Sequence, residues 1–276
     1  MVLFAHMSKS KPSTDFFSTH PVFRREVYLR HRFAAGRSRL TAKNLLAKHV
    51  AAGRLVRVRG GVFAVVPTGV SPEGFQPDPY VVASQLTPDA VVAFHAALQF
   101  HGKAYSAWTR FHYLTRKRAR PLSFRGLEFV PVLTSSVHGK NLAAQPGVQT
   151  VRHAGGEVRV TSLERTLVDV LDQPQKAGGW EEAWRSLELV EFFDLDAVLA
   201  LVKVLGTAVT AARVGFFLDQ HRDALMVDDH HLEALQRTAP KSPRYLDASR
   251  EPGTLVPRWQ LVVPDAVLHR AWEETG

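Results

Sequence analysis

Eight side chains in the first quarter of the chain are of the types that contact duplex DNA. They are cations with a threonine and an asparagine among them, followed by two alternating arginines: Arg37, Arg39, Thr41, Lys43, Asn44, Lys48, Arg57 and Arg59. Lysine and arginine mostly neutralise phosphates, whereas asparagine can bond an adenine edge through two hydrogen bonds. We therefore predict base contacts from Thr41 and Asn44 and backbone contacts from the six cations. The alternative for any one cation is an ordinary solvated charge.

A predicted pair of helices positions the first six of these residues. Apolar residues near a helical spacing over residues 20–33 indicate a supporting helix, which Gly36 breaks. Thr41 can cap a second helix that runs to about residue 52, with Leu45, Leu46 and Val50 turned inward. Such a helix is about 18 Å long, enough to lie across a major groove. Its N-terminus also presents backbone N–H groups that favour a phosphate.

A predicted β-hairpin carries the last two arginines. Residues 55–59 and 62–66 are rich in β-formers and are joined by Gly60 and Gly61, which suit a two-residue type I′ turn with positive φ at both positions. Arg57 and Arg59 alternate with valines, so one strand face would be apolar and the other would offer guanidinium groups to DNA. Two helices followed by such a hairpin predict a winged helix-turn-helix domain.

Positive charge is concentrated in the same region. Residues 1–67 hold 13 Lys and Arg against Asp15 and Glu26, a net charge of +11. The other 209 residues hold 22 basic and 24 acidic side chains, a net charge of −2. This segregation is typical of a polyanion-binding domain joined to an ordinary globular one. The alternative is a basic tail that only aids solubility.

Proline and glycine mark the predicted domain boundaries. Residues 67–79 contain four prolines and two glycines, which can continue neither a helix nor a central strand. We predict a loosely ordered lead-in over residues 1–14, a winged-helix domain over 15–67, a linker over 68–79 and a larger domain over 80–276.

The larger domain is predicted to be α+β because its strands come before most of its helices. The expected strands cover residues 109–114, 127–134, 148–161 with a turn at Gly155-Gly156, and 259–264, and the expected helices cover 90–101, 162–171, 180–192, 196–205 and 210–220. Ser162 is the expected N-cap of the helix that carries Arg165 and Asp169. These two residues are candidates for a contact with a partner or a nucleic acid; the alternative is an ion pair within the helix or between domains.

The sequence lacks the common catalytic signatures. It has no G-x-S-x-G elbow, P-loop, dinucleotide fingerprint or H-E-x-x-H helix, so we predict no catalytic, cofactor-binding or metal-binding residues and no enzymatic activity. The run Asp228-Asp229-His230-His231 invites a metal, but adjacent residues on a helix or turn point in different directions, and we expect an exposed polar turn. Glu157 and Arg159 on a predicted strand are the nearest approach to a nuclease site, without an obvious aspartate partner.

Several segments in order resemble the AbiEi family of antitoxins from type IV toxin-antitoxin systems. The first is TAKNLLAKHVAAGRLVRVRGGVFAVVP, followed by AVVAFHAALQFHGKAYS, RVTSLERTLVDVLDQP, GGWEEAWRSLELVEFFDLD, ARVGFFLDQHRDALMV and PRWQLVVP. The resemblance implies that the first domain represses its own operon at inverted repeats. It also implies that the second counteracts a nucleotidyltransferase toxin without a stable complex. Members often carry two basic residues before the wing glycine, whereas this chain has Arg59-Gly60-Gly61, which would loosen the wing.

Two other functions stay open beside a DNA-binding repressor and antitoxin. One is a DNA-processing enzyme with a nuclease-like second domain, and the other is a one-component regulator whose second domain senses a small ligand. The sequence has no cysteine and no run of 18 uncharged apolar residues, so we expect a cytoplasmic protein without a membrane span.

Overall fold

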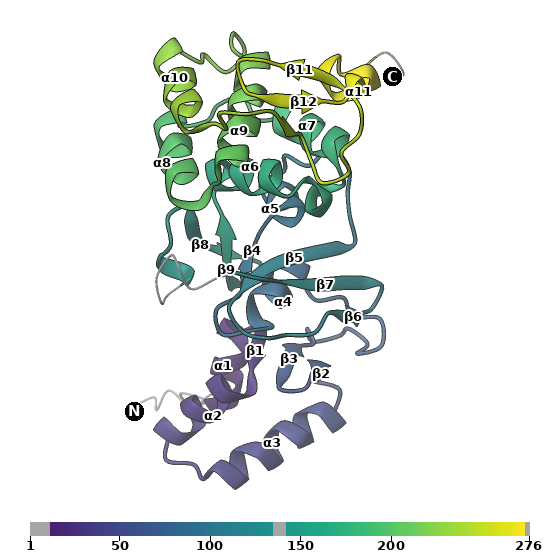
Figure 1. Cartoon of the computed structure of the whole chain (residues 1–276). Coiled ribbons are helices and arrows are strands. Elements are labelled where there is room, and N and C mark those ends of the chain that lie inside the picture. Colours follow the sequence, from purple (N-terminus) through teal and green to yellow (C-terminus); the bar gives the residue numbers. More distant parts are fainter. Residues whose placement is uncertain (1–11, 135–141, 274–276) are drawn as a thin grey trace, which may run out of the picture.

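The computed structural model describes residues 12–134 and 142–273 and has an α+β fold with three separate sheets. The chain forms an N-terminal part, a central sheet layer and a helical half stacked in that order (Figure 1). The helix α3 lies at the end of the molecule furthest from α10, with its outer side uncovered by other elements (Figure 1).

Three helices and a three-stranded antiparallel sheet make up the N-terminal part. Its elements are α1 (Pro12–Thr19), β1 (Val22–Arg24), α2 (Arg25–Ala34), α3 (Arg39–Ala51), β2 (Leu55–Arg59) and β3 (Val62–Val65), with the strand order β1-β3-β2. Aromatic and aliphatic side chains fill the core between helices and sheet, namely Phe16, Phe23, Tyr28, Ala42, Leu46, Leu55 and Phe63. Burial of these side chains fixes which face of α3 points outward.

The predicted helix over residues 20–33 is wrong at its start. Val22 and Phe23 form β1 and pair with Ala64 and Phe63 of β3, so α2 begins only at Arg25. Residues 22–24 form a strand instead of a helix because all three pair with residues of β3. The local spacing of apolar residues cannot reveal a partner so far along the chain. Residues 1–11 of the predicted lead-in lie outside the described residues, whereas Pro12–Thr14 already belong to α1.

The hairpin forms where it was predicted, but its turn is not type I′. Only Gly61 has a positive φ, at 89°, and the β2–β3 register shifts between Arg57 and Arg59. A type I′ turn needs positive φ at both central positions, so this connection is a bulged turn. The second predicted turn is displaced by one residue, because Ala154 and Gly155 hold the positive φ values and Gly156 pairs with His153.

A six-stranded mixed sheet forms the centre of the molecule. Its strands are β4 (Val91–Val92), β5 (Arg110–Thr115), β6 (Leu122–Phe124), β7 (Leu127–Leu133), β8 (Val148–His153) and β9 (Gly156–Thr161), in the order β6-β7-β5-β4-β9-β8. The helices α4 (Pro79–Gln85) and α5 (His95–Phe100) pack beside it. The predicted helix over residues 90–101 is therefore half wrong, since Val91 and Val92 pair with β5 and Val92 also pairs with β9.

Six α-helices and a small sheet form the described part of the helical half. They are α6 (Leu163–Asp172), α7 (Trp180–Glu188), α8 (Leu195–Leu205), α9 (Ala208–Gln220) and α10 (Asp229–Thr238), with β10 (Arg244–Tyr245), β11 (Thr254–Val256), β12 (Leu261–Val263) and α11 (Asp265–Leu268). Ser162 caps α6 as predicted, because its side chain accepts the N–H of Arg165. The predicted helix over 180–192 ends at Glu188, and α10 was not predicted.

The N-terminal sheet packs on the central layer instead of standing apart from it. Val22, Val58, Val62 and Ala64 share a buried cluster with α4 and strands of the central sheet. The connecting segment is held as well, since Asp78 caps α4 and bonds His153 Nε2 at 2.9 Å. Residues 68–78 thus join two parts that share a core.

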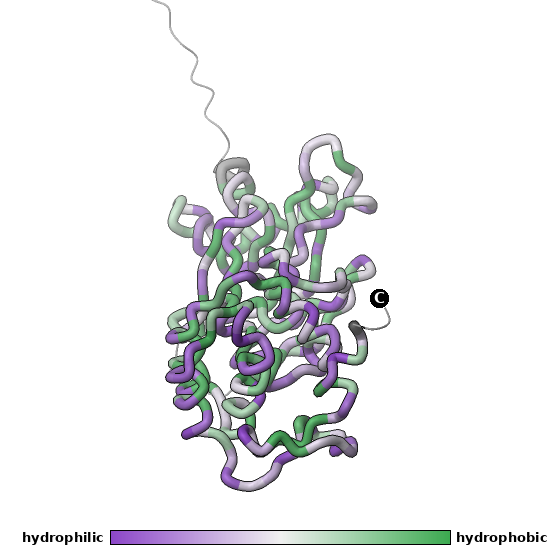
Figure 2. The backbone as a smooth tube through the Cα atoms, turned by 90° about the horizontal axis from the view of Figure 1, so that it is seen from above, coloured by the Kyte–Doolittle hydropathy of each residue, from purple (hydrophilic) through white to green (hydrophobic). Residues whose placement is uncertain are grey.

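Hydrophobic and hydrophilic stretches are interspersed along the whole described chain (Figure 2). Among the described residues, every helix is too short or too polar to cross a membrane.

Candidate nucleic-acid interface

The outer face of α3 collects the polar residues that the sequence singles out. The exposed positions are one helical face, namely Arg39, Leu40, Lys43, Asn44, Ala47 and Lys48, with Arg37 and Thr41 exposed beside them. Ala42, Leu46 and His49 are buried on the opposite face. Leu45 and Val50, which were predicted to point inward, are only half-buried. The structure therefore brings six of the eight predicted DNA-contact residues to one surface.

The cap of α3 is Ser38 and not Thr41 as predicted. Ser38 Oγ accepts the N–H of Thr41 at 3.1 Å and lies 2.8 Å from Thr41 Oγ1. The helix consequently begins at Arg39, which places Thr41 in the first turn with an exposed side chain. Serine and threonine both cap well, and the spacing alone did not separate them. Leu40, 69% exposed, was not singled out by the sequence and lies on the same face.

The cations of this face have no acidic partner within the described residues. None of Arg37, Arg39, Lys43 and Lys48 forms an ion pair there, and the first turn of α3 contains no acidic residue. In contrast, Arg25 of α2 lies 3.5 Å from Glu26. Unpaired cations on one rigid helix produce a local positive potential that attracts phosphates.

The two hairpin arginines do not act as a pair. Arg57 is exposed on the side of the sheet that faces the helices, with its guanidinium 5.8 Å from the ring centre of Phe63. Arg59 is half-buried and donates from Nη2 to the carbonyl of Arg120 at 3.4 Å. The prediction that both offer guanidinium groups from one strand face is wrong, because the bulge between them breaks the alternation.

A basic loop of the central layer lies beside Arg59. This basic loop, residues 116–120, has the sequence Arg-Lys-Arg-Ala-Arg, with Lys117, Arg118 and Arg120 exposed. Asp89 anchors its base by accepting the N–H of Arg116 at 2.9 Å. The loop was not predicted from the sequence, because the net charge of −2 over residues 68–276 hides a short basic run.

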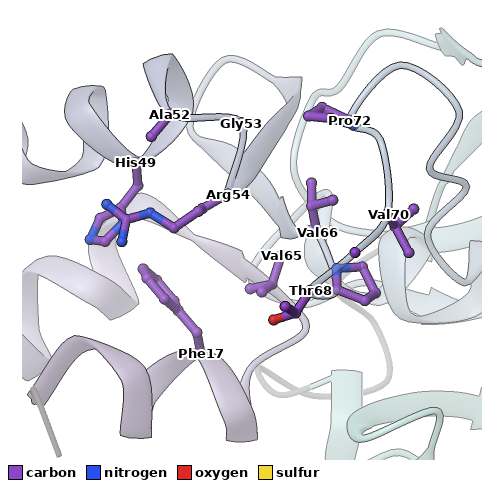
Figure 3. Close-up of a pocket in the computed structure, with 12 residues that line it drawn as sticks. Phe17, His49, Ala52, Gly53, Arg54, Val65, Val66, Thr68, Val70 and Pro72 are labelled. Atoms are coloured by element: carbon purple, nitrogen blue, oxygen red, sulfur yellow. The ribbon is translucent and has the colours of Figure 1, made fainter.

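A hollow of about 530 Å³ lies behind α3, between α1, the end of α3 and the connecting segment. Phe17, His49 and Arg54 converge on one side of it, and Val65, Val66 and Thr68 lie across from them (Figure 3). Both ring nitrogens of His49 are buried without a partner in the described structure. Burial, with Arg54 and Arg32 nearby, lowers the pKa of His49, so its ring is neutral near pH 7.

The candidate pair in the larger domain is an internal ion pair. Arg165 Nε lies 3.1 Å from Asp169 Oδ2, and Nη1 of Arg165 donates to the carbonyl of Pro146 at 3.0 Å. Arg165 is 3% exposed, so it does not present its guanidinium to a partner. Burial raises the pKa of Asp169 to about 6, although the charge of Arg165 acts in the opposite direction.

The strand residues considered for a nuclease site do not assemble one. Glu157 is exposed on β9, whereas Arg159 donates to the carbonyls of Pro88 and Ser84 at 2.9 and 3.3 Å. A two-metal or one-metal nuclease centre needs carboxylates that converge on one point. Glu157 and Arg159 therefore provide no geometry for phosphodiester cleavage.

No family model and no curated protein matches the chain. A solved structure described as the RV2827C protein from Mycobacterium tuberculosis is similar, with a TM-score of 0.59 over 96% of this chain and 94% of that chain. The two sequences are 16% identical, so the likeness shows a shared fold alone.

Proposed function

We propose that the protein binds duplex DNA, with residues 12–66 acting as a winged helix and α3 as the helix that enters the major groove. The observation that carries this proposal is the outer face of α3, where unpaired cations surround Asn44. An α-helix fits the major groove, and residues near its N-terminus usually reach base edges. Asn44 would read an adenine, Leu40 would contact a thymine methyl group, and the cations would hold the phosphates.

The hairpin would make a smaller contribution than a free wing. Its second face is covered by the central layer, so only Arg57 and the turn remain open to a phosphate. The basic loop, residues 116–120, extends the positive surface from the turn onto the central layer. DNA would thus meet α3 first and the basic loop second.

The test is binding of the full chain to a duplex as a function of salt. If about six phosphates are neutralised, the plot of log K against log salt has a slope of about −5. Fluorescence anisotropy with a labelled duplex from the promoter of the protein's own operon measures this slope, and an unrelated duplex gives the non-specific reference. An affinity that does not change with salt contradicts DNA binding through cations.

We further propose that the protein represses its own operon and acts in the cytoplasm as the antitoxin to a nucleotidyltransferase toxin. This step rests on the series of sequence segments that resemble AbiEi antitoxins. The test is co-expression with the product of an adjacent nucleotidyltransferase-like reading frame. Rescue of growth by the full chain supports the proposal, whereas growth arrest with and without the chain contradicts it.

A ligand-sensing regulator is the second candidate, with its ligand placed in the hollow behind α3, in the N-terminal part, and not in the second domain as the sequence analysis predicted. The exposed cation of Arg54, beside the apolar side chains of Phe17 and Val65, suits a small ligand with a carboxylate and an apolar body. A thermal-shift series with benzoate as the probe, on the wild type and on Arg54→Ala, tests this candidate. A benzoate-dependent shift in the wild type alone supports it, and equal curves in both proteins count against it.

A further inference from the structure

Two histidines and an aspartate from different helices gather at the outer end of the helical half. Asp196 lies in the first turn of α8, and His230 and His231 lie in the first turn of α10. One possible ligand atom from each lies within 4.8 Å of the other two. We propose that these three side chains bind a divalent transition-metal ion of the Zn²⁺ class, which would clamp α8 to α10.

The two imidazoles converge, contrary to the expectation from adjacent positions in a sequence. Their ring centres are 3.7 Å apart with an interplanar angle of 38°. His231 reaches back to the helix start, where its Nδ1 accepts the N–H of Asp228 at 3.3 Å, and this turns its ring toward that of His230. The expectation of an exposed polar turn is therefore wrong for His231, which is 8% exposed.

The spacing between the ligand atoms suits a bridging ion better than a direct hydrogen bond. His231 Nε2 and Asp196 Oδ1 are 3.8 Å apart, which is too long for a hydrogen bond. A metal bonded at about 2.0–2.1 Å holds two tetrahedral ligand atoms about 3.4 Å apart. Asp196 and His230 are exposed, so their side chains can rotate to close the remaining distance.

The charge around the three residues favours a cation. Asp228 Oδ2 lies 3.9 Å from His230 Nδ1, and Asp229 follows in the same helical turn. These carboxylates offset the positive N-terminal end of α10. Arg222 is the opposing charge nearby, and it is engaged by Asp229 at 2.8 Å.

The donor set selects the kind of metal. Two imidazole nitrogens and one carboxylate oxygen suit Zn²⁺ and its neighbours, whereas Mg²⁺ prefers oxygen ligands and keeps its waters. Three protein ligands leave a fourth position for water. When Nε2 of His231 binds the metal, Nδ1 carries the ring proton, so the long contact with the Asp228 N–H is lost on binding.

Isothermal titration calorimetry of the tag-free full chain with ZnCl₂ tests the proposal. We expect one equivalent of Zn²⁺ with a Kd of about 1–10 µM, weaker than four-ligand structural zinc sites. At a hundredfold excess of free Zn²⁺ over Kd, the midpoint of thermal unfolding should rise by about 5 °C. MgCl₂ at the same concentration should leave the midpoint of thermal unfolding unchanged.

Variants of the two exposed ligands locate the ion. His230→Ala and Asp196→Asn should each weaken Zn²⁺ binding roughly tenfold or more while leaving the metal-free unfolding midpoint unchanged. The matched control is His269→Ala, which removes an exposed histidine of the small-sheet region and should bind Zn²⁺ as the wild type does. Equal Zn²⁺ affinity in the wild type and both ligand variants, or no stoichiometric binding up to about 100 µM Zn²⁺, overturns the proposal.

Discussion

The outer face of α3 and the interior of the helical half use their cations in opposite ways. On α3, Arg39, Lys43 and Lys48 point outward and have no acidic partner in the described structure. In the helical half, Arg165 is buried against Asp169, and Arg213 donates to the carbonyls of Leu246 and Asp172 at 2.6 and 2.7 Å. Cations of the first kind are available to a polyanion, whereas cations of the second kind hold elements together.

The placement of a cation, and not the number of cations, decides whether it can bind a ligand or stabilises the fold. A buried cation that bonds carbonyls and a carboxylate cannot be removed without leaving those groups unsatisfied. An exposed cation without a partner contributes little to folding. Substitution of a buried cation should therefore lower the free energy of unfolding, whereas substitution of an exposed cation on α3 should lower the affinity for DNA.

The largest effect is expected for Arg165→Met, which keeps the side-chain volume and removes the charge. Asp169 then stays buried without its cation, so the free energy of unfolding at pH 7.5 should fall by about 3–5 kcal/mol. Urea denaturation measures it. DNA binding by the variant, at a temperature where it is folded, should match that of the wild type. A selective loss of DNA binding would show that Arg165 contributes to the DNA contact.

The pH dependence of the same variant shows whether ionisation of Asp169 raises or lowers the free energy of unfolding. The pKa of Asp169 is raised to about 6 in the folded protein, and removal of Arg165 would raise it further. A raised pKa contributes stability that is full below the unfolded value of about 3.9 and is lost as the pH rises through 6. The difference in stability between wild type and variant should thus be small near pH 4 and largest above pH 6, as urea denaturation at several pH values can show.

A smaller effect is expected for Asn44→Ala. An asparagine bonded to an adenine contributes about 1–3 kcal/mol of discrimination, so the ratio of specific to non-specific affinity should fall by that amount. Because Asn44 is exposed, the free energy of unfolding should stay within about 0.5 kcal/mol of the wild type. Competition binding with matched and mismatched duplexes measures the ratio, and an unchanged ratio would remove Asn44 from the interface.

Loss of the α3 cap is expected to affect stability modestly. Ser38→Ala removes the acceptor of the Thr41 N–H and should lower the free energy of unfolding by about 1 kcal/mol. Thr41→Val is the matched control, because it removes a hydroxyl from the same turn but keeps the cap. If Thr41→Val were the more destabilising of the two, the assignment of the cap would be wrong.

The smallest expected effect is a difference between Arg57 and Arg59 in their contribution to the salt slope of DNA binding. Arg57→Ala should reduce the salt slope by about 0.9, the value for one phosphate contact. Arg59→Ala should leave the slope unchanged, since its guanidinium bonds the carbonyl of Arg120. Salt titrations of the two variants side by side decide this, and a slope reduced by Arg59→Ala would place that side chain on the DNA.

Much of the secondary structure could be predicted from local signals. The glycines at 60–61 and 155–156 located both hairpins to within one residue. Ser162 could be predicted as the N-cap of α6 because its side chain bonds an N–H only three residues further along the chain. Turns and helix caps depend on a few consecutive residues, so they can be predicted without knowledge of the tertiary structure.

What depends on distant partners could not be predicted. Val22 and Phe23 form a strand only because β3 lies beside them, and Val91 and Val92 do so because β5 and β9 flank them. The separation of Arg57 from Arg59 depends on a bulge, and the approach of Asp196 to His231 depends on the packing of α8 against α10. Pairing and packing override propensity at such positions.

The charge on α3 can be tested against an equal charge elsewhere on the molecule. One variant replaces Arg37, Arg39, Lys43 and Lys48 by alanine, and its control replaces four exposed cations of the helical half by alanine, namely Lys203, Arg237, Lys241 and Arg244. Both variants lose the same net charge, so only the place of the charge differs. We expect the α3 variant to bring the salt slope of DNA binding from about −5 to about −2 while the control keeps the wild-type slope. Equal slopes in the two variants would contradict the assignment of α3 as the DNA-binding helix.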